Sequence, residues 1–406
     1  MTSFQTRLLF SITGYIIATP KRDFIQIKMT HFFAKVIIFT LFLGALSNAE
    51  FLSVSGKDFY YGQSKVFLSG TNIAWNSYGY DFGNDNYANS GPILEQWIRE
   101  IALAGGNILR IWLHIEGDDT PLFDSQGNVT GTDRLGNLIR DLETFLDVSA
   151  QNNVFVIPVL WNGALMRNTN FVNLVLSDEK LQTYIDNALR PMVRQLASKP
   201  ALAAWEVMNE PEGSALIESN ANRCYDTTII GRWGAGWTGA NIPMERFLRF
   251  INRQNAAIRQ EDPKVLITLG SWSEHSQTDA FSDSVNHYTD SCLIGAGGEQ
   301  EGTIDFYQMH TYSWEGRWSD TSPFKIPATA YQLTKPIVIG EFSSVCGENE
   351  GVDTLWYNAY NSAYQGIWSW QYNAGGHCSD TKADQNRGMT HIRNFAHNGQ
   401  IPVNIQ

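Results

Sequence analysis

The chain has 406 residues, of which 43% are hydrophobic and 17% charged, a composition typical of globular proteins with a sizeable buried core. Its formal charge of −12 argues against nucleic acid and anionic polymers as partners, and favours a neutral one. Aromatic residues make up 13% of the chain, and such rings can stack on flat uncharged ligands as well as pack a core.

Residues 1–49 are predicted to be a targeting segment that is removed from the mature chain. Val36–Ala45 is a short apolar run, and the small residues Ser47 and Ala49 after it are typical of a signal-peptide cleavage site. The run is too short to cross a bilayer comfortably. A second methionine, Met29, would start a signal peptide of ordinary length, so we interpret the residues before it as an upstream extension. We therefore expect a secreted monomer without a membrane anchor.

Four cysteines follow this segment. An even number in a secreted chain indicates two disulfides, and four cysteines allow three pairings. Of these we favour Cys224–Cys292 and Cys346–Cys378. The cysteines lie in loop-like sequence without a CxxC spacing, so we expect no zinc site, and no other metal or cofactor. Asn128, in the sequence Asn-Val-Thr, is a candidate glycosylation site.

Residues 50–406 contain no linker or internal repeat, so they are predicted to form one domain that begins with a hairpin at Phe51–Tyr61. After the hairpin, eight apolar runs of strand length alternate with mostly helical patterns. The predicted strands are Val66–Ile73, Asn107–Leu113, Val154–Leu160, Ala201–Met208, Val265–Leu269, Ile304–Met309, Ile337–Ile339 and Ile367–Trp370. The predicted helices are Ser90–Ala104, Asp133–Ala150, Ser177–Ser198, Pro243–Gln260, Ala328–Leu333, Val352–Tyr364 and Ala383–His397.

Nearly all of these strands are continuous apolar runs, as in parallel sheets that are covered by helices on both faces. Eightfold alternation over this length predicts an α/β fold, a (β/α)8 TIM barrel. A doubly wound open sheet is the alternative, although no strand is followed by the glycine-rich turn of its nucleotide-binding version.

Polar and aromatic residues recur at the carboxyl ends of the predicted strands, where a barrel carries its chemistry. In chain order they are Arg110, Trp112, His114, Trp161, Asn162, Asn209, Glu210, Ser271, Trp272, His310, Tyr312, Glu341 and Trp370. Glu210 and Glu341 would face one barrel mouth from roughly opposite sides. Cleavage of a glycosidic bond needs such a pair, because one carboxyl protonates the leaving oxygen and the other acts on the anomeric carbon or on water. The alternative is that each ends its strand in a turn or a salt bridge.

The other strand-end residues suit supporting roles. Arg110 would lower the pKa of one carboxyl and keep it ionised, and Tyr312 would donate a hydrogen bond to the same group. Asn209 would bind a sugar hydroxyl, and Trp370 would form a floor for a sugar ring. A buried ion pair or core packing is the alternative for each, and a structural histidine is the alternative for His310. Further candidate sugar platforms, some of which are expected to be core residues, are Trp75, Trp112, Trp161, Trp237, Trp272 and Trp314.

Together these residues resemble glycoside hydrolase family 5, whose members are retaining (β/α)8 glycosidases. The resemblance rests on five motifs in the family's order: Leu109–Trp112 with Arg110, Asn209-Glu210-Pro211, His310-x-Tyr312, Ile339–Phe342 with Glu341, and Trp368–Trp370. It implies that Glu210 is the acid/base and Glu341 the nucleophile. It also implies supporting roles for Arg110, Asn209, His310, Tyr312 and Trp370.

The resemblance extends to the substrate. Many cellulases of this family carry a histidine at the end of the third strand, where this chain has Leu160-Trp161-Asn162, and a tryptophan there is similar to the β-mannanase branch. Trp233–Ile258 also resembles the mollusc-type endo-β-1,4-mannanases of invertebrates. The implied activity is retaining hydrolysis of internal β-1,4 bonds in mannan, galactomannan or glucomannan.

Two alternatives remain from the sequence. An endo-β-1,4-glucanase would use the same fold and the same neutral, β-linked class of polysaccharide. A non-catalytic carbohydrate-binding barrel is the alternative of a different class, although binding alone would not require both glutamates. A metal-dependent hydrolase is disfavoured because the eight histidines include no HxxxH motif.

Overall fold

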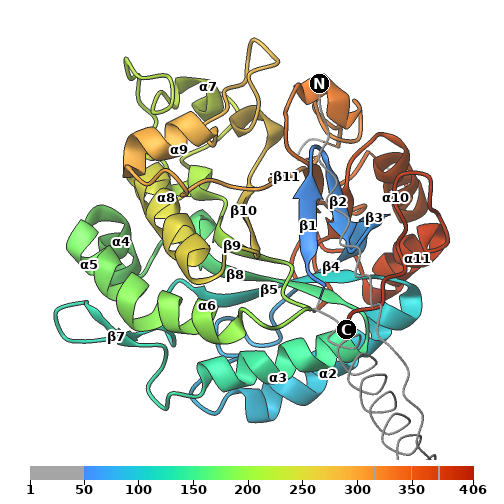
Figure 1. Cartoon of the computed structure of the whole chain (residues 1–406). Helices are drawn as coiled ribbons and strands as arrows, with labels where there is room; N and C mark the ends of the chain where they lie inside the picture. Colours follow the sequence, from blue (N-terminus) through green and yellow to red (C-terminus); the bar gives the residue numbers. More distant parts are fainter. Residues whose placement is uncertain (1–49, 314–315, 349, 374) are drawn as a thin grey trace, which may run out of the picture. The chain divides into compact units, whose positions relative to one another are not determined.

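Eight parallel strands close into a barrel in the computed structural model (Figure 1). The structure describes residues 50–313, 316–348, 350–373 and 375–406, so the predicted targeting segment and Trp314 lie outside the described residues. Around the barrel the strands are β4 (Leu68–Ala74), β5 (Ile108–Ile115), β8 (Phe155–Asn162), β9 (Ala204–Asn209), β10 (Leu266–Ser271), β11 (Tyr307–His310), β12 (Ile337–Glu341) and β13 (Gly366–Ser369). The predicted (β/α)8 barrel is confirmed, and the open sheet is excluded.

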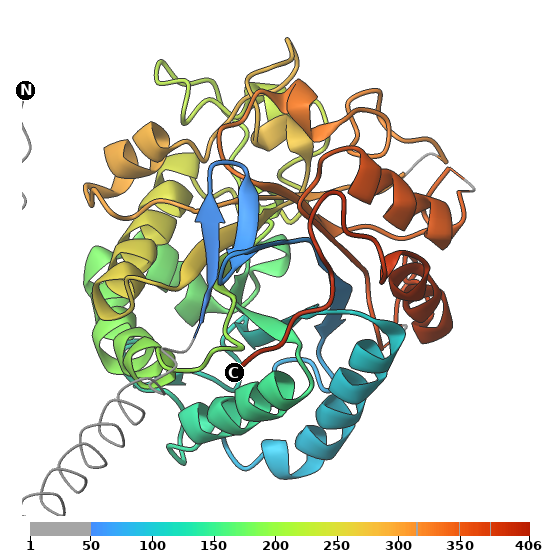
Figure 2. The ribbon, with the colours of Figure 1, turned by 45° about the vertical axis from the view of Figure 1, so that its right-hand side comes forward.

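Helices surround the barrel and bury the outward faces of its strands (Figure 2). The helices of the described residues are α2 (Tyr87–Ala104), α3 (Leu138–Gln151), α4 (Thr169–Leu176), α5 (Asp178–Tyr184), α6 (Arg190–Leu196), α7 (Thr228–Gly231), α8 (Met244–Glu261), α9 (Asp290–Gly297), α10 (Val352–Asn361) and α11 (Lys382–Ile392). Of these, the short α7 lies in the loop that follows β9. Among the described residues, none of the helices is long and apolar enough to cross a membrane.

A small antiparallel sheet closes the amino-terminal end of the barrel. It consists of β1 (Leu52–Ser55), β2 (Asp58–Tyr61) and β3 (Ser64–Val66), so the predicted hairpin gains a third strand. The Phe59 ring lies 5.1 Å from the Phe306 ring, and the Tyr61 ring lies 5.4 Å from that of Phe155. Because Phe306 and Phe155 stand where their strands begin, this end is filled by side chains. The site is therefore expected at the opposite end of the barrel, where the strands finish.

The predicted helix Ser177–Ser198 contains one irregular turn. Between α5 and α6, residues Ile185–Leu189 form a π-helical turn, in which the Arg190 N–H binds the Ile185 carbonyl. Pro191 has no N–H to continue the regular pattern, which explains why the wider turn forms here. Helical structure nevertheless runs without a gap from Asp178 to Leu196 and is capped by Ser177, so the predicted helix is present and the wider turn inside it is the difference.

Other boundaries differ by up to five residues. Helix α3 begins at Leu138 and not at Asp133. The Asp133 carboxylate accepts hydrogen bonds from the Asn137 and Leu138 N–H groups, so this residue precedes the helix and caps its start. Residues Ala328–Tyr331 form a 3-10 turn, so the helix predicted there is shorter. Helices α4, α7 and α9 and a small hairpin, β6 (Leu122–Phe123) with β7 (Val129–Gly131), were not predicted.

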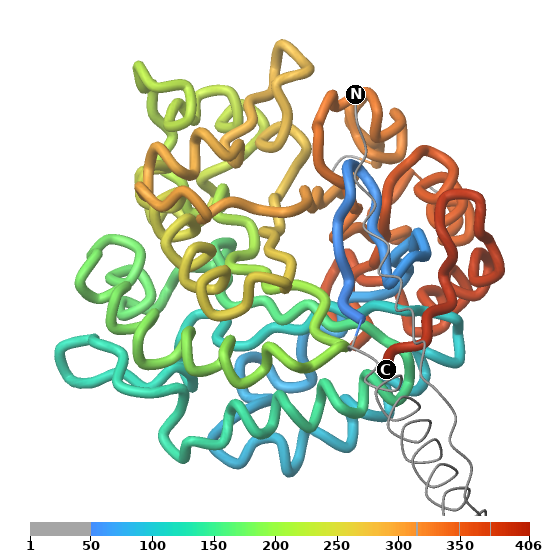
Figure 3. Tube along the Cα trace, in the orientation of Figure 1, coloured from blue at the N-terminus to red at the C-terminus, as the bar shows by residue number. Residues whose placement is uncertain are grey.

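The loops that follow β9 and β10 gather at the same end of the barrel (Figure 3). Trp233 in the first loop stacks on His275 in the second, with ring centroids 3.8 Å apart, and Arg223 pairs with Asp279. This end is the one at which the barrel strands finish, so these loops form part of the wall around the site.

Candidate active site

Five of the predicted strand-end residues are the last residues of their strands, among them Asn162 in β8 and Ser271 in β10. Asn209 ends β9, His310 ends β11 and Glu341 ends β12, and His310 is paired with Glu341 in the register of the two neighbouring strands. Arg110 lies in the middle of β5, one layer deeper, and is fully buried. Parallel strands therefore bring together side chains that are up to 231 positions apart in the chain.

Glu210 follows β9 in a left-handed backbone conformation, with φ of 41°. This conformation costs a non-glycine residue about 1 kcal/mol, and Pro211 after it disfavours the right-handed helical alternative. The turn is held by a 2.7 Å hydrogen bond from the Glu210 N–H to the Gly270 carbonyl. A Cβ at Gly163 would lie 2.6 Å from the Pro211 Cα, so only glycine lets the neighbouring loop pack against this turn.

Glu341 is held by two donors. The Arg110 Nη1 donates to its Oε1 at 2.6 Å, and the Tyr312 hydroxyl donates to its Oε2 at 3.0 Å. Burial, and then the charge of Glu341, raise the pKa of Tyr312 well above its usual value, so this hydroxyl keeps its proton and remains a donor. The carboxylate is thereby fixed in position on the floor of the barrel mouth.

Arg110 is shared between several acceptors. Its Nε and Nη2 donate to the two oxygens of Glu206 at 2.6 Å each, while Nη2 also reaches Asn209 Oδ1 at 2.7 Å. Burial acts to lower the pKa of Arg110, but Glu206 and Glu341 outweigh it, so the guanidinium stays charged. Glu206 was not predicted as a site residue, since its only signal in the sequence is a charge inside an otherwise apolar strand.

The electrostatics of Glu341 correct one expectation. Burial raises its pKa above the usual value, whereas the nearby His310 and Arg110 act to lower it. The lowering that we predicted from Arg110 is therefore present but is outweighed by burial, partly because Glu206 competes for the same guanidinium. Between the two glutamates, the one in contact with Arg110 loses its proton first.

Glu210 has a different environment. Its Oε1 lies 2.7 Å from His310 Nδ1, and burial, followed by the charge of Glu212, raises the pKa of Glu210 to about 8. Burial lowers the pKa of His310 to about 4, so the imidazole is neutral at pH 7. Glu210 is therefore a carboxylic acid at neutral pH, beside a neutral histidine that can accept from it or donate to it.

The two glutamates also belong to a cluster of possible metal ligands. Among the described residues, two groups bring three possible ligand atoms within 4.8 Å of one another: Glu210, His310 and Glu341, and Cys346, His377 and Cys378. The cysteines of the second group form a disulfide. In the first group, the guanidinium on Glu341 would repel a cation, and the donors fit proton transfer better.

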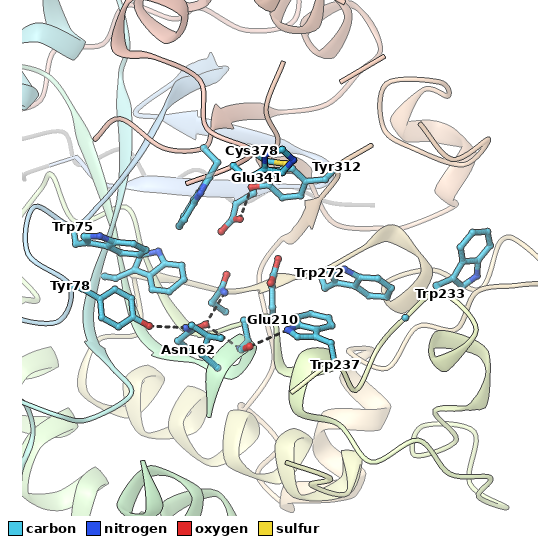
Figure 4. Close-up of a pocket in the computed structure, with 17 residues that line it drawn as sticks. Trp75, Tyr78, Asn162, Glu210, Trp233, Trp237, Trp272, Tyr312, Glu341 and Cys378 are labelled. Carbon is cyan, nitrogen blue, oxygen red and sulfur yellow. Dashed lines mark hydrogen bonds between the residues drawn. The ribbon is translucent and has the colours of Figure 1, made fainter. Parts of the chain in front are cut away.

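A cleft of about 710 Å³ opens above the glutamates, and aromatic rings line it on both sides (Figure 4). On one side Trp75 meets Trp112 and Trp370, with ring centroids 5.3 Å and 5.6 Å away. On the other side Trp237 and Trp272 lie 5.6 Å apart, and Trp233 is nearby. Of the predicted platforms, Trp75, Trp112, Trp237, Trp272 and Trp370 line the cleft.

Trp161 and His114 are placed elsewhere, which corrects their predicted roles. Trp161 is fully buried outside the barrel, where it stacks on Phe171, and its indole N–H binds Gln254 Oε1 at 3.1 Å. The His114 ring contacts Trp161, because the pairing of β5 with β8 is irregular between Trp112 and Ile115 and reverses which side chains point inward. Neither residue lines the cleft.

A series of hydrogen bonds links four polar side chains along one cleft wall, and only its two asparagines were predicted from the sequence. Asn209 Nδ2 donates to Asn162 Oδ1 at 3.1 Å, Asn162 Nδ2 lies 3.4 Å from the Tyr78 hydroxyl, and that hydroxyl donates to Glu116 at 2.7 Å. Asn209 is therefore committed to Arg110 and Asn162 in this structure. Asn162 and Tyr78 line the cleft beside it.

Both favoured disulfides are present. Cys224–Cys292 joins the loop after β9 to α9, and Cys346–Cys378 joins the loops that follow β12 and β13. The second disulfide therefore links the segment after Glu341 to the segment after Trp370, and Cys378 lies on the cleft wall.

The barrel, its two glutamates of unlike environment and the ring-lined cleft define a glycoside hydrolase. Residues 66–376 match the cellulase family, glycosyl hydrolase family 5, and the chain belongs to this family. The resemblance noted from the five motifs is thus confirmed.

Several relatives are similar over most of their length. The mannan endo-1,4-beta-mannosidase of Cryptopygus antarcticus is 51% identical over 364 residues, which cover 88% of this chain and 95% of the relative. That of Mytilus edulis is 40% identical over 357 residues, 87% and 95% of the two chains. The crystal structure of the endo-1,4-beta-mannanase from Eisenia fetida has a TM-score of 0.87 at 49% identity, and the match covers 88% of this chain and 100% of that one. The predicted similarity to invertebrate mannanases is confirmed.

Proposed function

We propose that this chain is an endo-β-1,4-mannanase that cleaves internal bonds of mannans with retention at the anomeric carbon. The observation that carries the proposal is the unlike environment of the two glutamates. Glu341 accepts hydrogen bonds from Arg110 and Tyr312, whereas Glu210 faces a neutral histidine and holds its proton up to about pH 8 through a raised pKa. Such a pair separates the roles of nucleophile and acid.

The distance between the glutamates supports retention. An oxygen of each carboxylate lies within 4.8 Å of the other. Retaining glycosidases hold their two carboxyl groups about 5–5.5 Å apart, whereas inverting enzymes need about 6.5–9.5 Å to admit a water molecule. This separation leaves no room for a water between Glu341 and the sugar, so direct attack by Glu341 is favoured.

In the first step, Glu341 attacks the anomeric carbon while the bond to the leaving oxygen breaks. Glu210 gives its proton to that oxygen, so the leaving sugar departs as a neutral alcohol and a glycosyl ester forms on Glu341. Arg110 and Tyr312 hold the attacking carboxylate in place. Once Glu210 is ionised, the neutral His310 can donate a hydrogen bond to it from Nδ1–H while keeping the proton.

In the second step, a water molecule enters where the leaving sugar was. Ionised Glu210 removes a proton from this water as its oxygen attacks the anomeric carbon, and the bond to Glu341 breaks. Glu341 is restored as a carboxylate, Glu210 is again protonated, and two inversions give net retention.

The shape of the cleft supports internal cleavage. Aromatic rings lie on both sides of the glutamates, Trp75 and Tyr78 on one side and Trp237 and Trp272 on the other (Figure 4). Sugar units on both sides of the scissile bond could therefore stack on these rings. An enzyme that released single sugars from a chain end would need one side to be closed.

The choice of mannan rests on the named relatives, which are mannan endo-1,4-beta-mannosidases. A panel of soluble mannan, galactomannan, glucomannan and carboxymethylcellulose tests it by release of reducing ends. We expect activity on the mannans and little on the cellulose derivative. Equal or higher activity on the cellulose derivative would favour the glucanase alternative, and the panel also measures tolerance of galactose branches.

The mechanism is tested by variants and by product configuration. Glu341→Ala and Glu210→Gln should each abolish most hydrolysis of mannan in a folded protein, and proton NMR should detect the β-anomer first. A folded Glu341→Ala variant with near-normal hydrolysis would contradict the mechanism. Binding of mannan by the unaltered protein without hydrolysis would favour the non-catalytic alternative.

We also propose that the protein is secreted as a monomer after cleavage before Glu50. Two disulfides support an oxidising compartment. Amino-terminal sequencing of the protein from an expressing cell's medium should begin at residue 50, and gel filtration should give a monomer. A glycosidase-sensitive mass shift that is lost in Asn128→Gln would identify Asn128 as glycosylated.

A further inference from the structure

A second buried carboxylate, Glu212, follows the acid/base by two positions. Its side chain is fully buried. The hydroxyls of Ser271 and Ser276 lie 2.8 Å from its Oε1, and the Tyr288 hydroxyl donates to the same oxygen at 2.6 Å. The Trp272 N–H reaches its other oxygen at 3.3 Å. Glu212 lies behind the cleft wall and does not line the cleft.

All of these partners of Glu212 are uncharged groups. Glu206 and Glu341 each share Arg110, whereas the donors around Glu212 are hydroxyls and one backbone amide. Burial, and then Glu212, raise the pKa of Tyr288 well above its usual value, so this tyrosine keeps its proton and donates. Among the described residues, no lysine, arginine or histidine pairs with Glu212, so neutral donors alone hold its carboxyl group.

The contacts of Glu212 join the two segments that frame the acid/base. Glu210 and Glu212 flank Pro211, while Ser271 and Trp272 come directly after Gly270, whose carbonyl accepts the Glu210 N–H at 2.7 Å. Ser276 and Tyr288 lie further along the same loop. Because Trp272 is on the cleft wall, one carboxylate connects the turn of Glu210 with a sugar-facing ring.

The charge of Glu212 also acts on Glu210. Burial is the main cause of the raised pKa of Glu210, and Glu212 is the next. The other charged or titratable groups that face Glu210 are Arg110 from β5, Glu206 from β9, His310 and Tyr312 from β11 and the loop after it, and Glu341 from β12. Arg110 acts in the opposite direction, and Glu206 acts in the same direction as Glu212.

We propose that Glu212 is a positioning residue of the acid/base, a fixed negative charge behind Glu210 that also holds Trp272 in the cleft wall. The inference rests on the proposed function of Glu210 as the proton donor. It assigns to Glu212 no contact with the substrate and no transfer of a proton.

The charge-removing variant Glu212→Gln tests the inference through the pH dependence of kcat/KM on soluble mannan. The alkaline limb reports the loss of the proton from the acid in the free enzyme. Removing a nearby negative charge makes that proton leave more easily, so the limb should move to lower pH by about one unit. Glu212→Asp keeps the charge and should restore the limb toward that of the unaltered protein.

Tyr288→Phe is the matched control. It removes one hydrogen bond to Glu212 but leaves the charge, so it should lower the thermal unfolding midpoint without lowering the alkaline limb. A merely structural role for Glu212 predicts instead that Glu212→Gln and Tyr288→Phe change stability alike and leave both limbs in place.

A second variant covers the case in which Glu212→Gln does not fold. Glu212→Met combined with Tyr288→Phe removes the carboxylate together with a hydroxyl that depends on it, which leaves fewer unpaired buried groups. Each of the Ser271 and Ser276 hydroxyls has a single proton, and without Glu212 each can donate it to the Ser273 carbonyl, which lies 3.1 Å and 2.9 Å away. This double variant should show the same downward shift of the limb.

The outcomes separate the inference from the proposed function. Glu210→Gln is measured in the same assay, and if it stays active, the proposed function fails. If Glu210→Gln is inactive and the folded Glu212 variants keep the alkaline limb of the unaltered protein, the inference about Glu212 is overturned.

Discussion

Arg110 connects Glu341 to Glu206, and the two carboxylates bind different nitrogens of the same guanidinium at 2.6 Å. Glu206 lies in the middle of β9 and also accepts from Gln308 Nε2 at 2.7 Å and from the Gly270 N–H at 3.1 Å. The guanidinium is thus oriented by a carboxylate that does not line the cleft. The position of the Glu341 carboxylate therefore depends on Glu206, one layer below it.

We expect Arg110→Lys to lower kcat/KM by about 100-fold or more, since a lysine cannot bind Glu206 through two nitrogens and still reach Glu341. The variant should also be less stable by about 3 kcal/mol because Glu206 loses a buried partner. Steady-state kinetics and denaturant unfolding measure both effects. Arg387→Lys is the control, because Arg387 is 53% exposed and pairs with Asp353 on the surface. Near-normal turnover by Arg110→Lys would contradict this account of Glu341.

The buried groups below the two glutamates also explain why residue 270, in β10, is a glycine. A Cβ on Gly270 would lie 2.7 Å from Glu206 Oε1, 2.8 Å from His310 Nε2 and 3.0 Å from Arg110 Nη2. We expect Gly270→Ala to displace these groups, to cost about 1–3 kcal/mol of stability and to reduce turnover. Thermal unfolding and mannan hydrolysis measure the two effects.

Gly295→Ala is the matched control for this substitution. A Cβ on Gly295, in α9, would meet no atom within 4 Å, and alanine is favoured over glycine inside a helix. This variant should be as active as the unaltered protein and slightly more stable. If both alanine variants behave alike, the space beside Gly270 is not restrictive.

The sequence was sufficient for the barrel and for the glutamate pair. Parallel strands finish at one end of a barrel, so strand-end residues such as Glu210 and Glu341 meet whatever their separation in the chain. The side of a strand to which a residue points was harder to predict. In β8 both faces are buried, and apolar runs of this kind do not distinguish Trp161, which faces the helices, from Asn162, which faces the cleft.

The local irregularities were also beyond the sequence pattern. The register shift in β5 turns His114 outward, and nothing in its neighbours distinguishes it from Trp112. Glu206 and Glu212 were not identified, because a single carboxylate in an apolar segment does not reveal which distant donors will reach it. Their partners, Arg110, Ser271 and Tyr288, come together only through the closed barrel and its loops.

The proton on Glu210 should be visible in the stability of the protein. Burial raises the pKa of Glu210 to about 8, above the value of about 4.3 expected in the unfolded chain. The corresponding contribution to stability is fully present below about pH 4 and is lost as the pH rises to 8. Glutamine cannot ionise, so Glu210→Gln should gain a few kcal/mol relative to the unaltered protein between pH 4 and pH 8.

Denaturant unfolding of both proteins at several pH values measures this difference. The gap in the free energy of unfolding should widen steadily as the pH rises. A gap that stays constant from pH 4 to pH 8 would mean that Glu210 ionises equally in the folded and unfolded chains, and an acid role at neutral pH would lose its basis.

Trp161 and Trp370 offer a direct test of which tryptophans meet the sugar. Trp370 lines the cleft against Trp75 and Trp112, so Trp370→Phe should raise KM for mannan several-fold as about 1 kcal/mol of stacking is lost. Trp161→Phe removes the donor to the buried Gln254 Oε1 and should cost about 1–3 kcal/mol of stability while KM is unchanged. Michaelis–Menten kinetics at a temperature where both variants are folded separate the two effects. A raised KM in Trp161→Phe alone would mean that the end of β8 contacts substrate after all, and that the ring seen packed on Phe171 moves when the sugar binds.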